Sequence, residues 1–166
     1  MEDHVIICGF GRVGKQVAED LKSQGCMFVI IESDQELIEE YSMKHDYTFV
    51  NGDATHDEDL KKAGIATARG LITCLPKDAD NLYAVLAGRE FNSNILIISR
   101  ASYYSAVSKL KLAGANNIIM PDSIGGSHMA SLIVNPDVME FLDIIRVQGN
   151  QGANVESITY EQLPPE

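Results

Sequence analysis

Tryptophan is absent from this sequence of 166 residues, and basic side chains are scarce. Thirteen Lys and Arg stand against 24 Asp and Glu, which gives a formal net charge of −11 at pH 7. A surface with this charge repels nucleic acid and anionic lipid. We therefore expect the partners to be small molecules or proteins, with no nucleic-acid binding and no direct lipid binding.

Long hydrophobic runs are also missing. The longest apolar runs, such as residues 5–8 and 27–31, are far shorter than the roughly 20 residues that a membrane-spanning helix needs. The first three residues include two acids, where a secretion signal would carry basic residues. We therefore expect a cytoplasmic chain.

Cysteines are too few and too poorly spaced for a disulfide framework or a zinc site. Cys8, Cys26 and Cys74 lie in or beside apolar runs, and no C-x-x-C pair occurs. We interpret them as reduced core residues. Because Cys8 and Cys74 would end two neighbouring strands, a redox pair between them is the less favoured alternative. No metal site is expected, since the histidines share no ligand spacing.

Short apolar runs alternate with amphipathic stretches, a pattern typical of repeated βα units on a parallel sheet. Strands are predicted near residues 4–8, 27–32, 47–50, 70–75, 95–100 and 117–120. Ser33 with Glu36, and Thr55 with Glu58, have the spacing of capping boxes for the helices that follow. Helix ends are predicted at three glycines, Gly25, Gly64 and Gly114. The pattern predicts an α/β fold, a Rossmann-like doubly wound domain with a six-stranded parallel sheet.

The pattern changes after Pro121. Residues 127–145 are rich in apolar side chains, and no later strand would pair with them to form a further βαβ unit. We therefore predict three parts: a nucleotide-binding domain at 1–122, a helical dimerisation arm at 123–145, and the stub of a possible C-terminal lobe at 146–166. The arm would expose a large apolar patch in a monomer, which favours a two-fold dimer in which it crosses to its partner. Folding of the arm back onto its own sheet is the alternative.

A glycine-rich turn follows the first predicted strand. Gly9, Gly11 and Gly14 complete the pattern G-x-G-x-x-G between a strand and a helix. The first glycine permits the tight turn, the second lets the backbone approach a pyrophosphate, and the third lets helix and strand pack closely. The helix N-terminus adds free N–H groups and a positive dipole. The expected anion-binding loop consists of Gly9, Phe10, Gly11, Arg12, Val13 and Gly14.

Three charged side chains lie in or near this loop, and each has two interpretations. Glu32 ends the second strand, where an acid either bonds both ribose hydroxyls and repels the 2′-phosphate of NADP, or only favours the next helix dipole. Arg12 either lies over phosphates or is an ordinary exposed charge. Asp53, with Ala54 beside it, either faces the adenine edge or forms a turn before Thr55.

Further candidates are nominated by position alone. In an open α/β sheet, ligands bind outside the carboxyl ends of the strands. Thr73, Leu75 and Asn81 surround the end of the fourth predicted strand, and Arg100 lies at the end of the fifth.

Several ordered motifs together resemble the RCK family, the regulators of potassium conductance, also called the Trk-type N-terminal NAD-binding domain. They are ICGFGRVG at 7–14, NGDAT at 51–55, LKKAGI at 60–65, DADN at 78–81 and AGAN at 113–116. The resemblance covers about residues 4–145, and the ordered set is far more specific than the glycine motif alone.

The resemblance implies a cytoplasmic sensor. NAD or NADH, or alternatively ADP, ATP or AMP, would sit in the cleft, with residues 9–14 and Arg12 at the phosphates, Glu32 at the ribose and Asp53 near the adenosine. It also implies that Thr73, Asn81 and Arg100 line the cleft. Two domains would pair through the helix after the sixth strand, and rings of such homodimers would act on a potassium channel or transporter pore in the inner membrane. Pore helices are missing from the sequence and the second lobe is at most a stub, so a free subunit and an excised channel fragment both stay open.

The rival interpretation is a fragment of an NAD-dependent oxidoreductase. Only about 45 residues follow the sixth predicted strand, too few for a typical substrate domain. None of the tyrosines has a lysine four residues on, so a Tyr-x-x-x-Lys proton donor is absent. We therefore expect a regulatory domain without catalytic residues.

Overall fold

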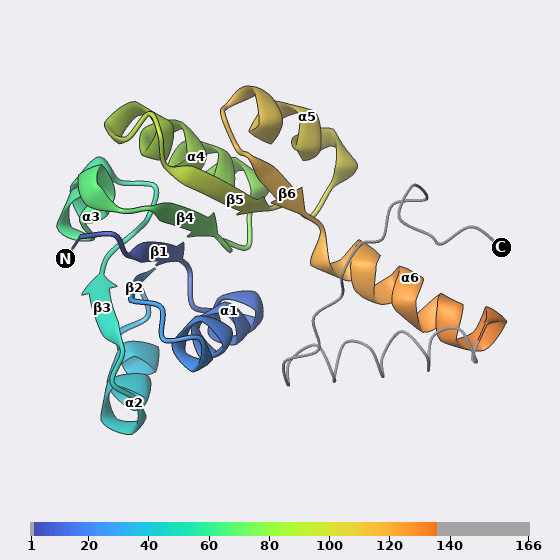
Figure 1. Cartoon of the computed structure of the whole chain (residues 1–166), viewed down its shortest axis with the longest axis horizontal. Coiled ribbons are helices and arrows are strands. Elements are labelled where there is room, and N and C mark those ends of the chain that lie inside the picture. The colour runs from blue at the N-terminus through green and yellow to red at the C-terminus, as the bar shows by residue number, and fades with distance from the viewer. Residues whose placement is uncertain (1, 136–166) are drawn as a thin grey trace, which may run out of the picture. The chain divides into compact units, whose positions relative to one another are not determined.

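The computed structural model of this chain describes residues 2–135, in which strands and helices alternate (Figure 1). Their order is β1 (Val5–Cys8), α1 (Arg12–Ser23), β2 (Phe28–Glu32), α2 (Gln35–Lys44), β3 (Thr48–Asn51), α3 (Asp57–Lys62), the 3₁₀ helix η1 (Ile65–Thr67), β4 (Gly70–Thr73), α4 (Asp78–Phe91), β5 (Leu96–Arg100), α5 (Tyr104–Leu112), β6 (Asn117–Ile119) and α6 (Pro121–Val134). No helix within the described part is long and apolar enough to cross a membrane. The chain divides into two compact units, Met1–Asp122 and Ser123–Glu166.

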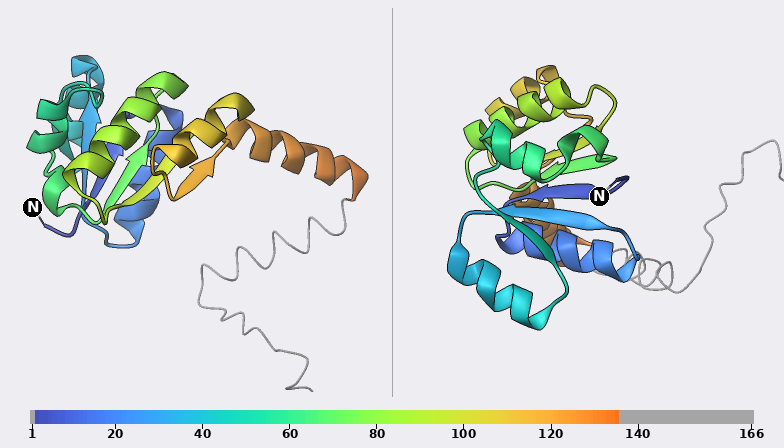
Figure 2. Two further views of the ribbon diagram at one scale, coloured as in Figure 1. Left: turned by 90° about the horizontal axis from the view of Figure 1, so that it is seen from above. Right: turned by 90° about the vertical axis from the view of Figure 1, so that its left-hand side faces the viewer.

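All six strands of the first unit form one parallel sheet in the order β3-β2-β1-β4-β5-β6. The helices α1 and α2 cover one face, and α3, α4 and α5 cover the other (Figure 2). The predicted doubly wound, six-stranded Rossmann-like fold is therefore confirmed. The strand order reverses between β1 and β4, so the loops after these two strands separate and leave a crevice at the carboxyl edge of the sheet.

Each face of the sheet has its own hydrophobic core, because successive strand side chains point to opposite faces. In β1, Val5 and Ile7 belong to the core that includes residues of α1 and α2, whereas Ile6 and Cys8 belong to the core that includes residues of α3, η1, α4 and α5. The same alternation holds in β2. Burial on both faces explains why these strands read as nearly continuous runs of Val and Ile.

Helix ends show where local patterns succeed and where they fail. The glycines expected to end helices, Gly25, Gly64 and Gly114, all adopt left-handed φ angles, 69°, 81° and 107°. The two predicted capping boxes are wrong. Asp34 caps α2 instead of Ser33, because its carboxylate accepts the Leu37 N–H at 3.1 Å while the Ser33 hydroxyl faces Glu32. Thr55 bonds to the carboxylate of Asp53, so α3 has His56 at its N-cap.

The helix α6 is the only described element that continues past the first unit. It ends at Val134, and its large apolar side chains are exposed: Ile124, Met129, Leu132, Ile133 and Val134. The remainder of the predicted arm, up to residue 145, and the predicted stub at 146–166 lie outside the described residues.

The alternation along β5 yields a test of the core. Ile97 is fully buried between the sheet and its helices, whereas its neighbour Leu96 is 49% exposed. We expect Ile97→Ala to lower the free energy of unfolding by about 2–5 kcal/mol through lost burial and a residual cavity. The control Leu96→Ala should cost about 1 kcal/mol or less. Chemical denaturation of both variants measures the difference, and equal losses would contradict the assignment of faces.

Candidate functional site

A cleft of about 820 Å³ lies at the carboxyl edge of the sheet. Its walls come from the β1–α1 loop, α1 as far as Asp20, the end of β2 and the start of α2, the loop after β4, the end of β5 and the start of α6. A smaller hollow of about 170 Å³ shares Gly9, Glu32 and Leu75 with it and continues to Asp53 and Ala54. The candidate residues from distant parts of the sequence therefore gather along one continuous edge.

One side of the glycine loop packs tightly against the protein, and the other side is open to the cleft. Gly9 has a φ of 90°, a conformation that other residues rarely adopt. A Cβ atom on Gly14 would lie 2.1 Å from the carbonyl oxygen of Gly9, so only glycine lets α1 approach the end of β1 this closely. A Cβ atom on Gly11, in contrast, would meet nothing within 4 Å, and this residue lines the cleft.

Helix α1 directs its N-terminus at this opening. Gly11 is the N-cap residue, and no side chain caps the helix. The first-turn N–H groups and the positive end of the helix dipole are therefore available to an anion. Arg12 and Val13, in that first turn, also line the cleft.

Phe10 supports the loop from behind and does not line the cleft. Its ring is fully buried and packs edge-on against Tyr41 and Phe49, with centroid distances of 4.8 Å and 5.2 Å. Only its backbone N–H faces a candidate residue, because it donates to Glu32 at 2.7 Å. Phe10 and Gly14 thus shape the loop, whereas Gly11, Arg12 and Val13 form its accessible surface.

The carboxylate of Glu32 ties together the starts of α1 and α2. Its Oε2 accepts the Phe10 N–H at 2.7 Å, and its Oε1 accepts the N–H groups of Ser33 and Asp34 at 2.7 Å and 2.9 Å. Both interpretations of Glu32 therefore have a structural basis, since the group faces the start of α2 and also lines the cleft. A carboxylate oxygen accepts up to two hydrogen bonds, so Oε2 retains acceptor capacity toward the cleft.

Asp53 forms the turn that precedes α3. Its Oδ1 accepts both the backbone N–H and the hydroxyl of Thr55 at 2.8 Å, and the backbone bond holds the pKa of Asp53 below its usual value. The turn-forming interpretation is correct for this carboxylate. Asp53 and Ala54 nevertheless line the smaller hollow, beside Glu32.

Sequence reasoning missed Asp59, which fixes this turn. Its Oδ2 accepts the Asp53 N–H at 2.9 Å, its Oδ1 accepts Lys62 Nζ at 2.8 Å, and a Cβ atom on Gly52 would lie 2.4 Å from its carboxyl group. Asp59 is one of three acids in the first turn of α3, and nothing in the local pattern separates it from the other two.

The positional candidates after β4 and β5 divide into two groups. Leu75 and Arg100 line the cleft. Thr73 does not, because its side chain is fully buried and its hydroxyl bonds Ser99 on the neighbouring strand at 2.8 Å. Asn81 is also buried, and its amide bonds both the N–H and the carbonyl oxygen of Leu75 at 3.0 Å. The expectation that Thr73 and Asn81 line the cleft is therefore corrected: they hold its walls.

Burial keeps the two strand-end thiols inert. Cys8 is fully buried, Cys74 is buried in the cleft lining, and desolvation raises the pKa of Cys74 to about 11. Burial and the neighbouring Cys74 raise the pKa of Cys8 as well. Burial thus disfavours the thiolate form that a redox pair of Cys8 and Cys74 would need.

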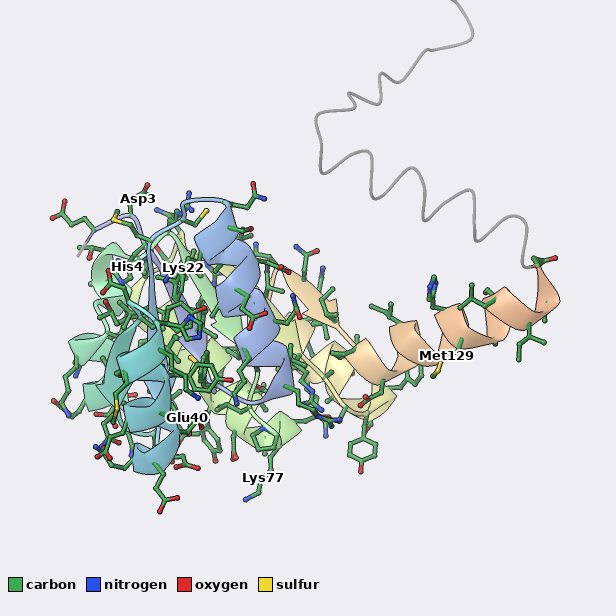
Figure 3. The ribbon with its side chains drawn as sticks, turned by 90° about the horizontal axis from the view of Figure 1, so that it is seen from below. Asp3, His4, Lys22, Glu40, Lys77 and Met129 are labelled. Carbon is green, nitrogen blue, oxygen red and sulfur yellow. The ribbon has the colours of Figure 1, made fainter. Side chains whose placement is uncertain are left out.

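The charges around the cleft are mixed. Two arginines line it, Arg12 from α1 and Arg100 from β5, together with four acids, Asp20, Glu32, Asp34 and Asp122. Lys77, in the loop after β4, points away from the domain into solvent (Figure 3). Positive charge in this cleft therefore comes from the two arginines and from the N-terminus of α1.

The fold and the glycine-loop cleft define a Rossmann-type domain with a candidate anion site at the carboxyl edge of its sheet. The sequence profile of the TrkA-N domain matches residues 5–121, and the chain belongs to this family.

Relatives and solved structures agree with this assignment. The chain is 44% identical over 144 residues to "Probable potassium channel protein 2" of Methanocaldococcus jannaschii, covering 86% of this chain and 42% of that protein. It is 29% identical to a "Trk system potassium uptake protein TrkA homolog" of Pyrococcus horikoshii, covering 96% and 75% of the two chains. The TrkA-N domain of the inner membrane protein YbaL from Escherichia coli superposes with a TM-score of 0.75 at 28% identity, covering 80% and 97%. GsuK bound to ADP superposes with a TM-score of 0.68 at 31% identity, covering 79% and 34%. The chain thus spans about two fifths of the Methanocaldococcus channel proteins that it matches.

The second and third glycines of the loop, Gly11 and Gly14, are a matched pair for a stability test. In Gly14→Ala the new methyl group overlaps the Gly9 carbonyl, and we expect a loss of about 1–3 kcal/mol of unfolding free energy despite alanine's better helix propensity. Gly11→Ala places its methyl group in open space and should cost about 1 kcal/mol or less. Thermal or denaturant unfolding of the two variants compares them. A Gly14→Ala protein as stable as Gly11→Ala would refute the close approach of α1 to β1.

Proposed function

We propose that this chain is a cytoplasmic regulatory domain that binds NAD(H) or an adenine nucleotide and transmits its occupancy to the pore of a potassium channel or potassium uptake system. One observation carries the proposal: the uncapped N-terminus of α1 opens at Gly11 onto a cleft that Arg12 and Arg100 also line. Relatives named for potassium channels and Trk uptake, and the ADP-bound structure of GsuK, support the same function.

The residues suit the parts of a nucleotide. The diphosphate would bind the N–H groups of residues 11–13 with Arg12, because a helix N-terminus and a guanidinium both favour phosphate. The ribose hydroxyls would bond Glu32, and the adenine would extend toward Asp53 and Ala54. Four loop-supporting residues hold this surface without contacting the ligand: Phe10, Gly14, Thr73 and Asn81.

This function needs no catalytic residue. A nucleotide changes the domain if it binds one arrangement of the cleft walls more tightly than another, and a coupling free energy of about 1–3 kcal/mol is sufficient for regulation. The relatives are named for potassium transport, and we therefore favour the regulatory role over an oxidoreductase fragment.

Nucleotide titration tests the proposal directly. We expect ADP and NAD to bind the chain in isothermal titration calorimetry, and Arg12→Ala to weaken both by about 1.5–3 kcal/mol through loss of a charge-assisted contact. Arg69→Ala is the matched control, because Arg69 is exposed and does not line the cleft. NADP should bind more weakly than NAD, since the Glu32 carboxylate repels a 2′-phosphate. Absence of binding by NAD, NADH, ADP, ATP and AMP alike would overturn the proposed function.

We further propose that two copies pair through the arm that begins with α6, and that such homodimers assemble into a ring below the pore. The exposed apolar side chains of α6 support this pairing, because contiguous exposed apolar surface is typical of an interface.

Light scattering tests the pairing. We expect a dimer for the unmodified chain at micromolar concentration and a shift toward monomer in Leu132→Asp, since a buried unpaired carboxylate is costly. The control Ser127→Asp places the same charge at an exposed polar position of α6 and should leave the dimer intact. A folded monomer of the unmodified chain would contradict the pairing.

A further inference from the structure

Arg100 faces an acid from α6 at one end of the cleft. Its Nη2 lies 3.9 Å from Oδ2 of Asp122, which is in the first turn of that helix. The Arg100 side chain is 21% exposed and that of Asp122 is 85% exposed. Both residues line the cleft. The pair therefore links the end of β5 to the start of α6 within the lining of the cleft.

This ion pair is weak. A separation of 3.9 Å is too long for a hydrogen bond, and solvent around Asp122 screens the attraction. The buried Nε of Arg100 has no hydrogen-bond partner among the described residues. A guanidinium carries five N–H donors in a planar fork that suits the oxygens of a phosphate. Arg100 consequently has donors to spare for a better acceptor than Asp122.

We propose that Asp122 competes with a nucleotide phosphate for Arg100, so that it sets the affinity of the cleft and links occupancy to the first turn of α6. The proposal rests on the proposed nucleotide-binding function. A phosphate that bonds the guanidinium in the cleft takes the place of the Asp122 carboxylate, which also repels it. Release of Asp122 removes the side-chain link between β5 and α6.

Helix α6 is suited to carry this event. It runs without a break from Pro121 to Val134, and Asp122 is the acid of its first turn, where a carboxylate favours the helix dipole. The boundary between the two compact units falls directly after Asp122. A change at this residue therefore acts at the point where the nucleotide-binding unit passes into the next one.

A double-mutant cycle on ADP affinity tests the competition in the whole chain. We expect Asp122→Asn, which keeps the side-chain shape, to tighten ADP binding by about two- to fivefold, the range of an exposed ion pair. In an Arg100→Gln background the same substitution should have no effect, because the group under competition is gone. Asp20→Asn is the matched control: Asp20 lines the same cleft from α1, and its described carboxylate partner is Gln16.

Hydrogen exchange of the α6 amides is a second measurement, and it reports on the helix itself, which the affinity does not. ADP should speed exchange at residues 125–130 of the unmodified chain, whereas in Asp122→Asn exchange should already be fast and insensitive to ADP. Any of three results, obtained while ADP still binds, refutes the competition and leaves the nucleotide function standing. The first is that Asp122→Asn tightens binding no more than Asp20→Asn does, and the second is that it tightens binding equally in both Arg100 backgrounds. The third such result is that the α6 amides do not respond to ADP. If neither ADP nor NAD binds the unmodified chain, both proposals fall together.

Discussion

The contact between Gly14 and the carbonyl oxygen of Gly9 is the constraint on which the cleft depends. A side chain at Gly14 would push α1 away from the end of β1, and the N–H groups of the first turn would then no longer lie beside the strand end. Phe10 fixes the intervening turn from the other side, because its ring is held by Tyr41 and Phe49 in the core. The loop is thus held by packing on its core side, and its helix N-terminus is uncapped on its cleft side. This is the arrangement that an anion site at a helix N-terminus requires.

Three other loops at this edge are held by hydrogen bonds between their backbone and polar side chains of α3 and α4. Asn81 of α4 bonds the backbone of Leu75, and Asp59 of α3 bonds the backbone of Asp53. Asp78, at the start of α4, accepts the N–H groups of Ser102 and Tyr103 after β5. These hydrogen bonds satisfy backbone groups of the loops that have no partner within the sheet, and they order the cleft walls before any ligand binds. Preorganisation of this kind lowers the entropic cost of binding.

The sheet and its glycine loop could be predicted from the sequence because their causes are local. Runs of Val and Ile buried on both faces, and glycines with left-handed φ at helix ends, leave their pattern in neighbouring residues. Thr73 and Asn81 were placed at the correct edge but on the wrong side of the cleft wall, because proximity to a strand end does not determine which way a side chain points. Their partners, Ser99 and Leu75, are set by strand register and loop path.

The particular roles of three acids could not be predicted, for a related reason. Asp34, Asp59 and Asp122 each stand at the start of a helix, where an acid has a general dipolar preference that hides any particular role. Asp34 is the cap in place of Ser33, because its carboxylate accepts the Leu37 N–H while the Ser33 hydroxyl donates to Glu32. Only the folded chain shows that Asp59 bonds the turn beside the cleft and that Asp122 lies beside Arg100.

The strong negative charge of the chain is compatible with an anionic ligand because the balance is decided locally. At the glycine loop the helix dipole and Arg12 would act on an anion over a few ångströms, whereas salt screens exposed charges that lie more than roughly 8–10 Å away. Four acids line the cleft itself, where a carboxylate close to a bound phosphate would repel it. A domain that reports nucleotide levels, as proposed, must release its ligand as those levels fall. Acids set beside an otherwise well-formed phosphate site therefore suit a sensor better than they would suit a protein that holds a permanent cofactor.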